Sequence, residues 1–310
     1  MSYSFLRESK LYIVYGSGAG IKYRIYTSTA ITFNQTFAEE SYSVKTLHDQ
    51  SKMFEGSIIN KANPASFSFD VPLTIEKDES PVLTLASDLS ISNTLTSFDM
   101  YIQTGSSTFK LEGAVITSAS FDFVPQNQFT MRVEGEGTKL TRAGDENFTI
   151  PCDSTFAESS TRTPLIVYPT VSLNDGSAKD MSHILSVNLT IQNEMEWTPY
   201  ETLHDSLNST TMFPSAHTVG NRIISGEIRQ YQIDTNNSDD NVRQFDDFST
   251  NTNLTITAKN VSGNTDFFKI QLNPAMFTAR MQPAEVYTQS YDFRSLDNTK
   301  VVPAQITIYS

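Results

Sequence analysis

The sequence predicts a mainly β protein made of two tandem, similar β-sandwich domains, each with a long hairpin loop and at most one short helix. Two observations predict this fold. Apolar and polar residues alternate with a period of two in many segments, and short motifs from the first half of the 310-residue chain return in the same order in the second half. Period-two alternation is typical of half-buried strands, and ordered recurrence indicates a duplicated domain.

The strands of the first half are predicted where this alternation is clearest. Residues 66–71 read Ser-Phe-Ser-Phe-Asp-Val, which places the two phenylalanines and the valine on one face. The same pattern predicts strands around residues 98–102 and 121–123. In the second half the alternating apolar residues are Leu185, Val187, Leu189, Ile191, Leu254 and Ile256. Such segments are typical of antiparallel sheets with one face on a core.

Four motifs carry the internal repeat. Ile-Val-Tyr at 13–15 returns at 166–168, Thr-Leu-His-Asp at 46–49 returns at 202–205, Met-Phe at 53–54 returns at 212–213, and Phe-Lys-Leu at 109–111 returns as Phe-Lys-Ile at 268–270. The spacing is 153 residues for the first motif and 159 for the last. A shared order with so little drift indicates duplication with small insertions.

The join between the predicted domains is polar and rich in turn residues. We predict a first domain over 1–145, a linker over 146–163 and a second domain over 164–310, because prolines punctuate this stretch at Pro151 and Pro164. Helical patterns are sparse, with one candidate in each half, near 87–94 and near 241–248.

One long segment in each half separates two predicted strands. Residues 37–65 and 193–222 hold the repeated Thr-Leu-His-Asp and Met-Phe motifs. Loops of this length in compact domains are usually functional or disordered. Because both halves keep the motifs, we predict an ordered, extended hairpin that reaches a neighbouring molecule.

Composition excludes several classes of protein. The net charge of −13, from 35 acidic and 22 basic residues, argues against ordinary nucleic-acid binding, which needs Lys and Arg at phosphates. Cys152 is the only cysteine, so an intrachain disulfide is excluded. The first ten residues are polar, unlike a signal peptide, and no apolar run approaches the ~18 residues that span a bilayer. We therefore expect synthesis in a cytoplasm and no membrane insertion.

A glycine-rich stretch follows the first predicted strand. Residues 16–20 read Gly-Ser-Gly-Ala-Gly, but Ile21 stands where a dinucleotide-binding fingerprint has its third glycine, and residues 22–26 alternate like a strand. A helix would be needed there to hold a pyrophosphate. The stretch is predicted to be a turn.

The two His-Asp pairs, at 48–49 and 204–205, are the nearest approach to a catalytic or metal-binding pattern. The chain has only four histidines, and none has metal-ligand spacing. The preceding Thr46 and Thr202 are suited to cap turns, with the aspartates three residues later. This pattern favours a structural or interface role.

The acidic stretch 234–240 resembles the start of a calcium loop. Asp239 stands in place of the required glycine, and Phe245 stands in place of the closing glutamate. A solvated acidic loop is the better interpretation. We predict no enzyme, no cofactor and no metal site.

Residues 98–104, 109–116 and 121–138 together resemble the C-terminal strands of bacteriophage major tail tube proteins. In that family a β-sandwich carries a flanking helix and a long hairpin that contacts the neighbouring ring, and inner strands from six domains close into a continuous barrel. Most members have one domain and form hexameric rings, whereas a fused two-domain type forms trimeric rings. This chain resembles the two-domain type.

The resemblance implies a structural virion protein of the phage tail, made in the host bacterial cytoplasm. Trimeric, pseudo-hexameric rings would stack around a lumen that conducts DNA without binding it specifically. Expected partners are further copies of the chain, the tape measure protein, the tail terminator and tail tip or baseplate proteins. The residues expected at ring-to-ring contacts are Thr46, His48, Met53, Phe54, Thr202, His204, Met212 and Phe213. Those expected to line an acidic lumen are Glu39, Glu40, Glu194 and Glu196.

An alternative function remains open from the sequence. A tandem β-sandwich could be a binding module of the tail tip or baseplate that recognises a cell-surface glycan or protein. Aromatic platforms would serve glycan binding, but Trp197 is the only tryptophan.

Overall fold

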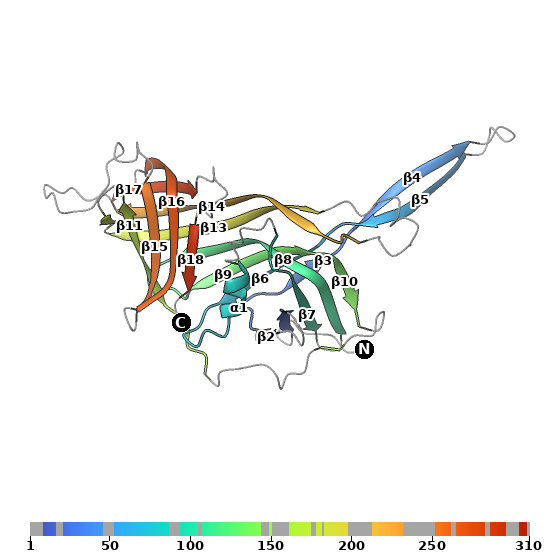
Figure 1. Ribbon diagram of the computed structural model, residues 1–310, viewed down its shortest axis with the longest axis horizontal. Coiled ribbons are helices and arrows are strands. Elements are labelled where there is room, and N and C mark those ends of the chain that lie inside the picture. Colours follow the sequence, from blue (N-terminus) through green and yellow to red (C-terminus); the bar gives the residue numbers. More distant parts are fainter. Residues whose placement is uncertain are drawn as a thin grey trace.

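The computed structural model is mainly β, as the sequence predicts. It describes residues 9–16, 21–45, 53–86, 94–104, 107–143, 149–150, 161–174, 178–181, 183–197, 213–231, 252–261, 265–282, 286–295 and 304–308. Within these residues it contains strands β1 to β18 and one helix, α1 (Figure 1). Sixteen strands form one branched sheet, and β4 and β5 form a second sheet.

The strands β1–β10 of the first half, apart from the β4–β5 hairpin, pair in an antiparallel order with one side branch. The order is β2 (Ile21–Ile25), β1 (Lys10–Tyr15), β7 (Phe98–Thr104), β8 (Ser107–Phe123), β9 (Thr130–Gly137), β6 (Ala65–Pro72) and β3 (Thr32–Asn34), with β10 (Lys139–Arg142) beside β8. The glycine-rich stretch joins β1 to β2, and Tyr15 pairs with Ile21 across it. Of the predicted turn only Gly16 is described, and residues 17–20 lie outside the described residues.

The strands β11–β18 of the second half pair in the same relative order. The order is β12 (Ala178–Met181), β11 (Val167–Asn174), β15 (Thr252–Asn260), β16 (Thr265–Gln282), β17 (Thr288–Ser295), β14 (His217–Tyr231) and β13 (Ile184–Trp197), with β18 (Ala304–Ile308) beside β16. Each of the first seven takes the place of its counterpart in the first half. The boundaries of two separate domains stay a prediction, because the ladder runs on from one half into the other.

Strand β8 makes this connection because it is long enough to belong to two ladders. Its first part pairs with β7 and β10, whereas Ser118 to Phe121 lie between β9 and β13, and the β13 ladder continues to Phe123. On the β13 side, Phe121 faces Leu189 and Ala119 faces Ile191. Strand β13 therefore extends the sheet of the first half.

The alternation in the sequence corresponds to real faces of the sheet. Along β6, Phe67, Phe69 and Val71 are buried while the serines and the aspartate between them are more exposed. Burying such side chains contributes roughly 1.5–3 kcal/mol each, which fixes the register, since a slip by one residue would expose them all.

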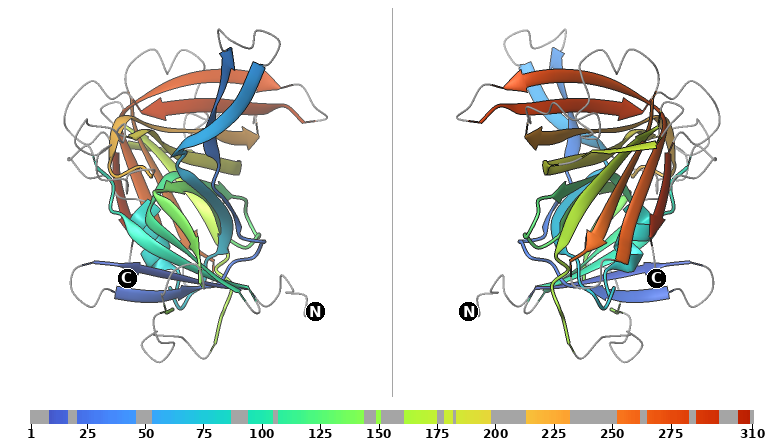
Figure 2. Two further views of the ribbon diagram at one scale, coloured as in Figure 1. Left: turned by 90° about the vertical axis from the view of Figure 1, so that its right-hand side faces the viewer. Right: turned by 90° about the vertical axis from the view of Figure 1, so that its left-hand side faces the viewer.

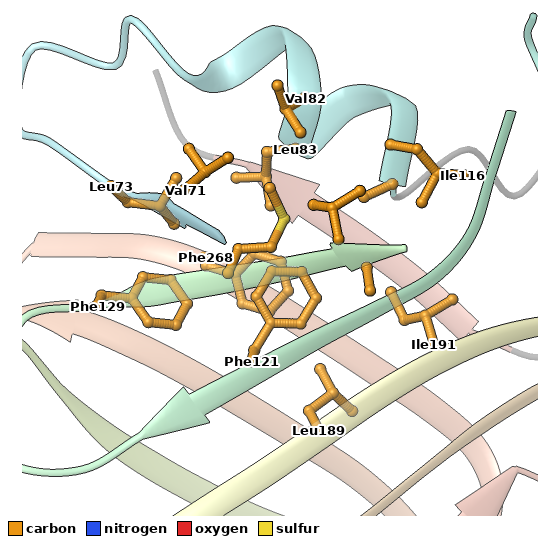
Figure 3. Close-up of a cluster of buried hydrophobic side chains, with 14 of the residues drawn as sticks. Val71, Leu73, Val82, Leu83, Ile116, Phe121, Phe129, Leu189, Ile191 and Phe268 are labelled. Carbon is orange, nitrogen blue, oxygen red and sulfur yellow. The ribbon is translucent and has the colours of Figure 1, made fainter. Parts of the chain in front are cut away.

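Aromatic rings from both halves meet in one core (Figure 3). Phe121, Phe123 and Phe129 of the first half surround Phe268 of β16, and all four rings are fully buried. The centroids of Phe121 and Phe268 are 5.2 Å apart. Contacts between aromatic rings stabilise the fold beyond the burial of apolar surface, and they hold the two halves together.

Helix α1 (Ser80–Ala86) ends just before the segment where a helix was expected. Of the expected range 87–94 only Thr94 is described, and it is not helical. Pro81 lies in the first turn, where its missing N–H costs nothing, and the carbonyl of Glu79 accepts from the N–H of Val82 and of Leu83. The second expected helix, 241–248, lies outside the described residues.

A short strap over residues 161–166 runs between the two halves. Glu76 accepts bonds from the N–H and the hydroxyl of Thr163 at 2.8 and 2.7 Å, and the N–H of Leu165 donates to the carbonyl of Leu73. The end of the predicted linker is therefore bonded to the first half. Figure 2 shows the β1–β2 hairpin at one end of the molecule and the red-orange strands of β16 and β17 at the other.

The long segment 37–65 forms the predicted hairpin. Strands β4 (Phe37–Lys45) and β5 (Met53–Ala62) pair from Phe37 opposite Ala62 to Lys45 opposite Met53, and the hairpin projects from the rest of the protein (Figure 1). In the second half, β13 and β14 likewise continue as a pair, up to Trp197 opposite His217.

Candidate assembly surfaces

One face of the large sheet is polar over strands of both halves. A row of directly paired residues crosses it: Asp122, Asn188, Glu227, Asp292 and Thr278. Their neighbours along each strand point to the opposite face, which carries the core. The polar face is therefore continuous across the junction between β8 and β13.

This polar face carries more acids than bases. Its charged residues are Asp70, Asp122, Glu134, Glu136, Glu194, Glu196, Glu227 and Asp292 against Arg132, Arg229, Arg280 and Arg294. Three of the arginines pair with an acid on the same face: Arg132 with Glu134, Arg229 with Glu227, and Arg280 with Asp292. Among the described residues, eight carboxylates stand against four guanidinium groups, so the face is net negative.

Two of the predicted lumen residues lie on this polar face. Glu194 and Glu196 are exposed on β13, in the same alternation as Asn188. Glu39 is exposed on the projecting hairpin, in strand β4, and Glu40 follows it in the same strand. The sequence prediction missed the acids of β8, β9, β14 and β17, because it looked for acids in the long segments and not for one face of the sheet.

Trp197 is held at the edge of the polar face. Its indole N–H donates to Glu136 Oε2 at 2.6 Å, and its ring lies 5.4 Å from that of His217 in an edge-to-face arrangement. The N–H of Leu95 donates to Nε2 of His217 at 3.3 Å, and burial lowers the pKa of this histidine. The indole is therefore part of a packed cluster.

A single side chain fixes the base of the β4–β5 hairpin. Gln35 donates to the carbonyls of Asn63 and Thr138, at 3.0 and 3.1 Å, and accepts from the N–H of Leu140 at 2.9 Å. Both N–H donors and the carbonyl oxygen of this amide are therefore bonded to backbone groups. The hairpin therefore leaves the body in a defined direction.

The residues predicted at ring-to-ring contacts are only partly described. Phe213 is half-buried beside this hairpin base, with its ring 6.5 Å from that of Phe37 and with Lys139 Nζ 5.1 Å from its centroid. Met53 and Phe54 begin strand β5. Thr46, His48, Thr202, His204 and Met212 lie outside the described residues, as does the acidic stretch 234–240.

Several strand edges have no partner among the described strands: β2, β10, β12 and β18 each pair on one side only, and two further open edges lie at β3 and at the end of β16. Strand β3 pairs only with β6. The last part of β16, from Met276 to Gln282, pairs with β17 on one side only, whereas β15 and β18 cover the earlier part. Unpaired edges present rows of N–H and C=O groups that can pair with another chain.

Exposed apolar side chains lie next to the edge of β16. Tyr231, Val286 and Tyr287 are 42, 54 and 56% exposed, at the end of β14 and just before β17. Thr288 pairs with both Tyr231 and Gln282, which brings this patch to the end of the β16 edge.

Chemical sites are not apparent in the part of the chain that the structure describes. No group of three or more His, Cys, Asp or Glu side chains there could hold a metal ion. No helix in these ranges is long and apolar enough to cross a membrane.

Comparison with known proteins gives the family. Residues 1–308 match the model of the Bacteriophage Baseplate Tube Protein Family, which is nearly the whole chain. The chain belongs to this family. A search of curated proteins found no match.

As a member of the baseplate tube family, the chain is a structural protein of the phage tail and baseplate. The resemblance to phage tail proteins is therefore confirmed, with the baseplate in place of the major tail tube as the named location. The family is a structural one, which agrees with the prediction that the chain is not an enzyme.

Proposed function

We propose that this baseplate tube protein assembles as trimeric, pseudo-hexameric rings that stack around a lumen through which DNA passes to the host. The family assignment over residues 1–308 supports a role in the tube of the tail or baseplate. The geometry that supports ring formation best is one pair among the open strand edges, β3 and the end of β16, which belong to opposite halves of the chain.

The repeated strand order supports the number of copies. Seven strands of each half pair in the same relative order, with one further strand beside the long β8 or β16. Two similar domains, divided as 1–145 and 164–310 with a linker between them, explain this repetition. Three copies of such a chain present six similar units around an axis, which is a heterologous arrangement that closes.

The polar face is the surface that we assign to the lumen. Its excess of carboxylates, including Glu194 and Glu196, repels phosphates and keeps DNA from adhering to the wall. Glu39 and Glu40 stand on the projecting hairpin and so belong to the part of the lumen near the next ring.

Stacking of rings is assigned to the hairpin and its counterpart in the second half. Met53 and Phe54 lie in β5, and Phe213 lies at the hairpin base. Thr46, His48, Thr202, His204 and Met212 complete the proposed contact. Tape measure, tail terminator and other tail tip or baseplate proteins are the proposed partners in the virion tail, after synthesis in the host cytoplasm.

The alternative function, recognition of a cell-surface glycan or protein by a tail tip module, uses different surfaces. Trp197 is the only tryptophan of the chain, and Glu136 and His217 hold it in the fold. None of the described residues adds an observation that favours this alternative.

Negative-stain electron microscopy of the purified full chain, over a series of concentrations, tests the proposal. Rings with an open centre and apparent six-fold shape, alone or in stacks, are the expected result. Isolated particles without rings at every concentration, together with a positive glycan array, would contradict it and favour the tail tip module.

A further inference from the structure

At the junction between the two halves of the chain, a strand of the second half pairs with an edge strand of the first half. The outer edge of β8 is filled by β13, with Phe121 opposite Leu189 and Ala119 opposite Ile191. Beside it, Phe129 is fully buried, since Phe268 of the second half lies 6.4 Å away from it, ring to ring. A paired edge and a covered aromatic ring therefore define this junction.

Paired rows across the sheet give the equivalent positions in the two halves. In the first half, the row that starts at β3 reads Phe33, Phe67, Gly135 and Ile116. In the second half, the row that starts at β13 reads Leu189, Gly226, Phe293 and Phe277. One row further on, Val133 faces Ala119 in the first half, and Tyr291 faces Ala279 in the second.

By these rows, the end of β16 is the counterpart of the part of β8 that pairs with β13. Ala279 and Met281 then correspond to Ala119 and Phe121, and Tyr287 corresponds to Phe129. In the second half the edge is unpaired among the described strands, and Tyr287 is 56% exposed where Phe129 is buried. Among the described residues, the second half therefore carries an unfilled copy of the internal junction.

The chain also carries the strand that fits this copy. Strand β3 corresponds to β13, and its second edge is open among the described strands. Its side chains alternate as the fit requires: Ile31 and Phe33 are half-buried against the core, whereas Thr32 and Asn34 are exposed on the polar face. A second copy of the chain is thus the occupant that the repeat specifies.

We propose that β3 of one copy pairs antiparallel with the end of β16 of the next, in the register of the internal junction. Phe33 lies opposite Met281, Gln35 opposite Ala279, and Thr36 opposite Thr278 of the neighbouring copy. Tyr287 is buried at this interface, with Phe109 of the second copy in the role of Phe268. This inference rests on the proposed ring and specifies its interface.

A disulfide experiment tests the register. In a Cys152→Ser background, the pair Thr36→Cys with Thr278→Cys should cross-link copies into covalent dimers and trimers under mild oxidation, because opposed residues in a ladder have Cβ atoms about 4.5–5.5 Å apart. The control pair, Thr36→Cys with Arg280→Cys, is two residues out of register and should cross-link far less. All three positions are exposed, so the fold should lose only the exposed hydrogen bond from Asn63 to Thr36 and, in the control pair, the exposed ion pair of Arg280 with Asp292.

The outcomes separate the interface from the ring. Covalent trimers from the first pair alone support the inference. Rings seen for the Cys152→Ser chain, with no cross-link from either pair or with cross-links from the control pair alone, would overturn the proposed register but leave the ring standing. A chain that stays monomeric at all concentrations would overturn both.

A substitution at the exposed tyrosine gives an independent readout. Tyr287→Asp should weaken self-association by at least ~30-fold, since a buried aromatic ring at an interface contributes about 2 kcal/mol or more. Val261→Asp is the matched control, because Val261 is similarly exposed, at 53%, and lies outside the proposed interface. Equal association of both variants and the parent chain would overturn the assignment of Tyr287.

Discussion

Gly135 lies directly opposite Phe67 in the ladder between β9 and β6, and the phenyl ring fills the space above the glycine. A Cβ at residue 135 would stand 2.3 Å from Phe67 Cζ. At the equivalent place in the second half, Gly226 lies opposite Phe293, and a Cβ there would stand 2.6 Å from the ring. The phenylalanine is on β6 and the glycine on β9 in the first half, whereas in the second half the glycine is on β14, the counterpart of β6, and the phenylalanine is on β17. Each half therefore keeps one aromatic ring in this place.

Gly135→Ala should therefore destabilise the fold. The new methyl group also meets the backbone carbonyl oxygen of Val115 at 2.3 Å, which cannot move away without disturbing the ladder. Overpacking of this kind costs about 1–3 kcal/mol, which urea denaturation followed by circular dichroism will measure.

Gly220→Ala is the matched control for this substitution. Gly220 is also in a strand, but the nearest atom to its Cβ is the carbonyl oxygen of Glu194 at 3.8 Å. This variant should be as stable as the parent or slightly more stable. Equal effects at residues 135 and 220 would show that the contact with Phe67 is not the cause.

Glu79 should make the fold less stable as the pH rises. Burial raises the pKa of its carboxyl group above 4.5 and outweighs the bonds from Thr74, which lower the pKa. Oε2 accepts these bonds from the hydroxyl and the N–H of Thr74 at 2.8 and 3.3 Å. The unfolded chain therefore releases this proton first, and stability is lost from pH about 4.5 up through the higher pKa of the folded state.

The variant Glu79→Gln keeps an acceptor for Thr74 but does not titrate. The stability of the parent chain minus that of the variant should fall between pH 4 and pH 7, measured by urea denaturation at each pH. If this difference rises with pH instead, the pair with Arg162, whose Nη1 lies 3.9 Å from Oε1, outweighs burial.

His217 should have the opposite dependence on pH. Burial lowers its pKa below 6.5, so the unfolded chain takes up the proton first as the pH falls. Stability is complete above pH about 6.5 and is lost as the pH falls through the folded pKa. Because Trp197 is the only tryptophan and touches this ring, its fluorescence should change over the same range. In His217→Gln, both the stability and the fluorescence should be flatter between pH 5 and pH 7; an unchanged profile would contradict this account.

Charge reversal on the polar face should slow DNA ejection. Phage assembled with Glu194→Lys and Glu196→Lys should release DNA several-fold more slowly, because the wall then attracts phosphates. Asp180→Lys, at an exposed position on β12 that is not among the charged residues named for this face, is the control. Normal ejection kinetics with the double variant, measured by dye fluorescence on released DNA, would count against the assignment of this face to the lumen.

The sequence predicted the strands well because alternation is a direct consequence of burying one face. Phe67, Phe69 and Val71 show it most clearly, since all three are in the core. The hairpin over 37–65 followed from its length and from repeated motifs. Both predictions depend on local patterns that a strand must satisfy wherever it pairs.

Local patterns failed where pairing decides the answer. In the first half, Ile13 faces Met100. In the second half, the counterpart of Met100 is Ile256, and Val171 faces it. The structural counterpart of Ile13 is therefore Val171, five positions beyond the Ile166 that the Ile-Val-Tyr motif indicated. Helix α1 was missed because Pro81 and a contiguous apolar run hide its period. The polar face was missed because its acids come from separate strands that meet only through the junction of β8 with β13.

The central claim is that three copies of this chain form one closed ring, and the mass of the purified particle tests it most directly. Native mass spectrometry at low salt should give a particle of about 104 kDa, three times the 34.6 kDa of the chain. Larger particles should appear only at multiples of this mass, because closed rings stack as whole units. A monomer at every concentration, or a dimer as the largest closed species, would contradict the ring.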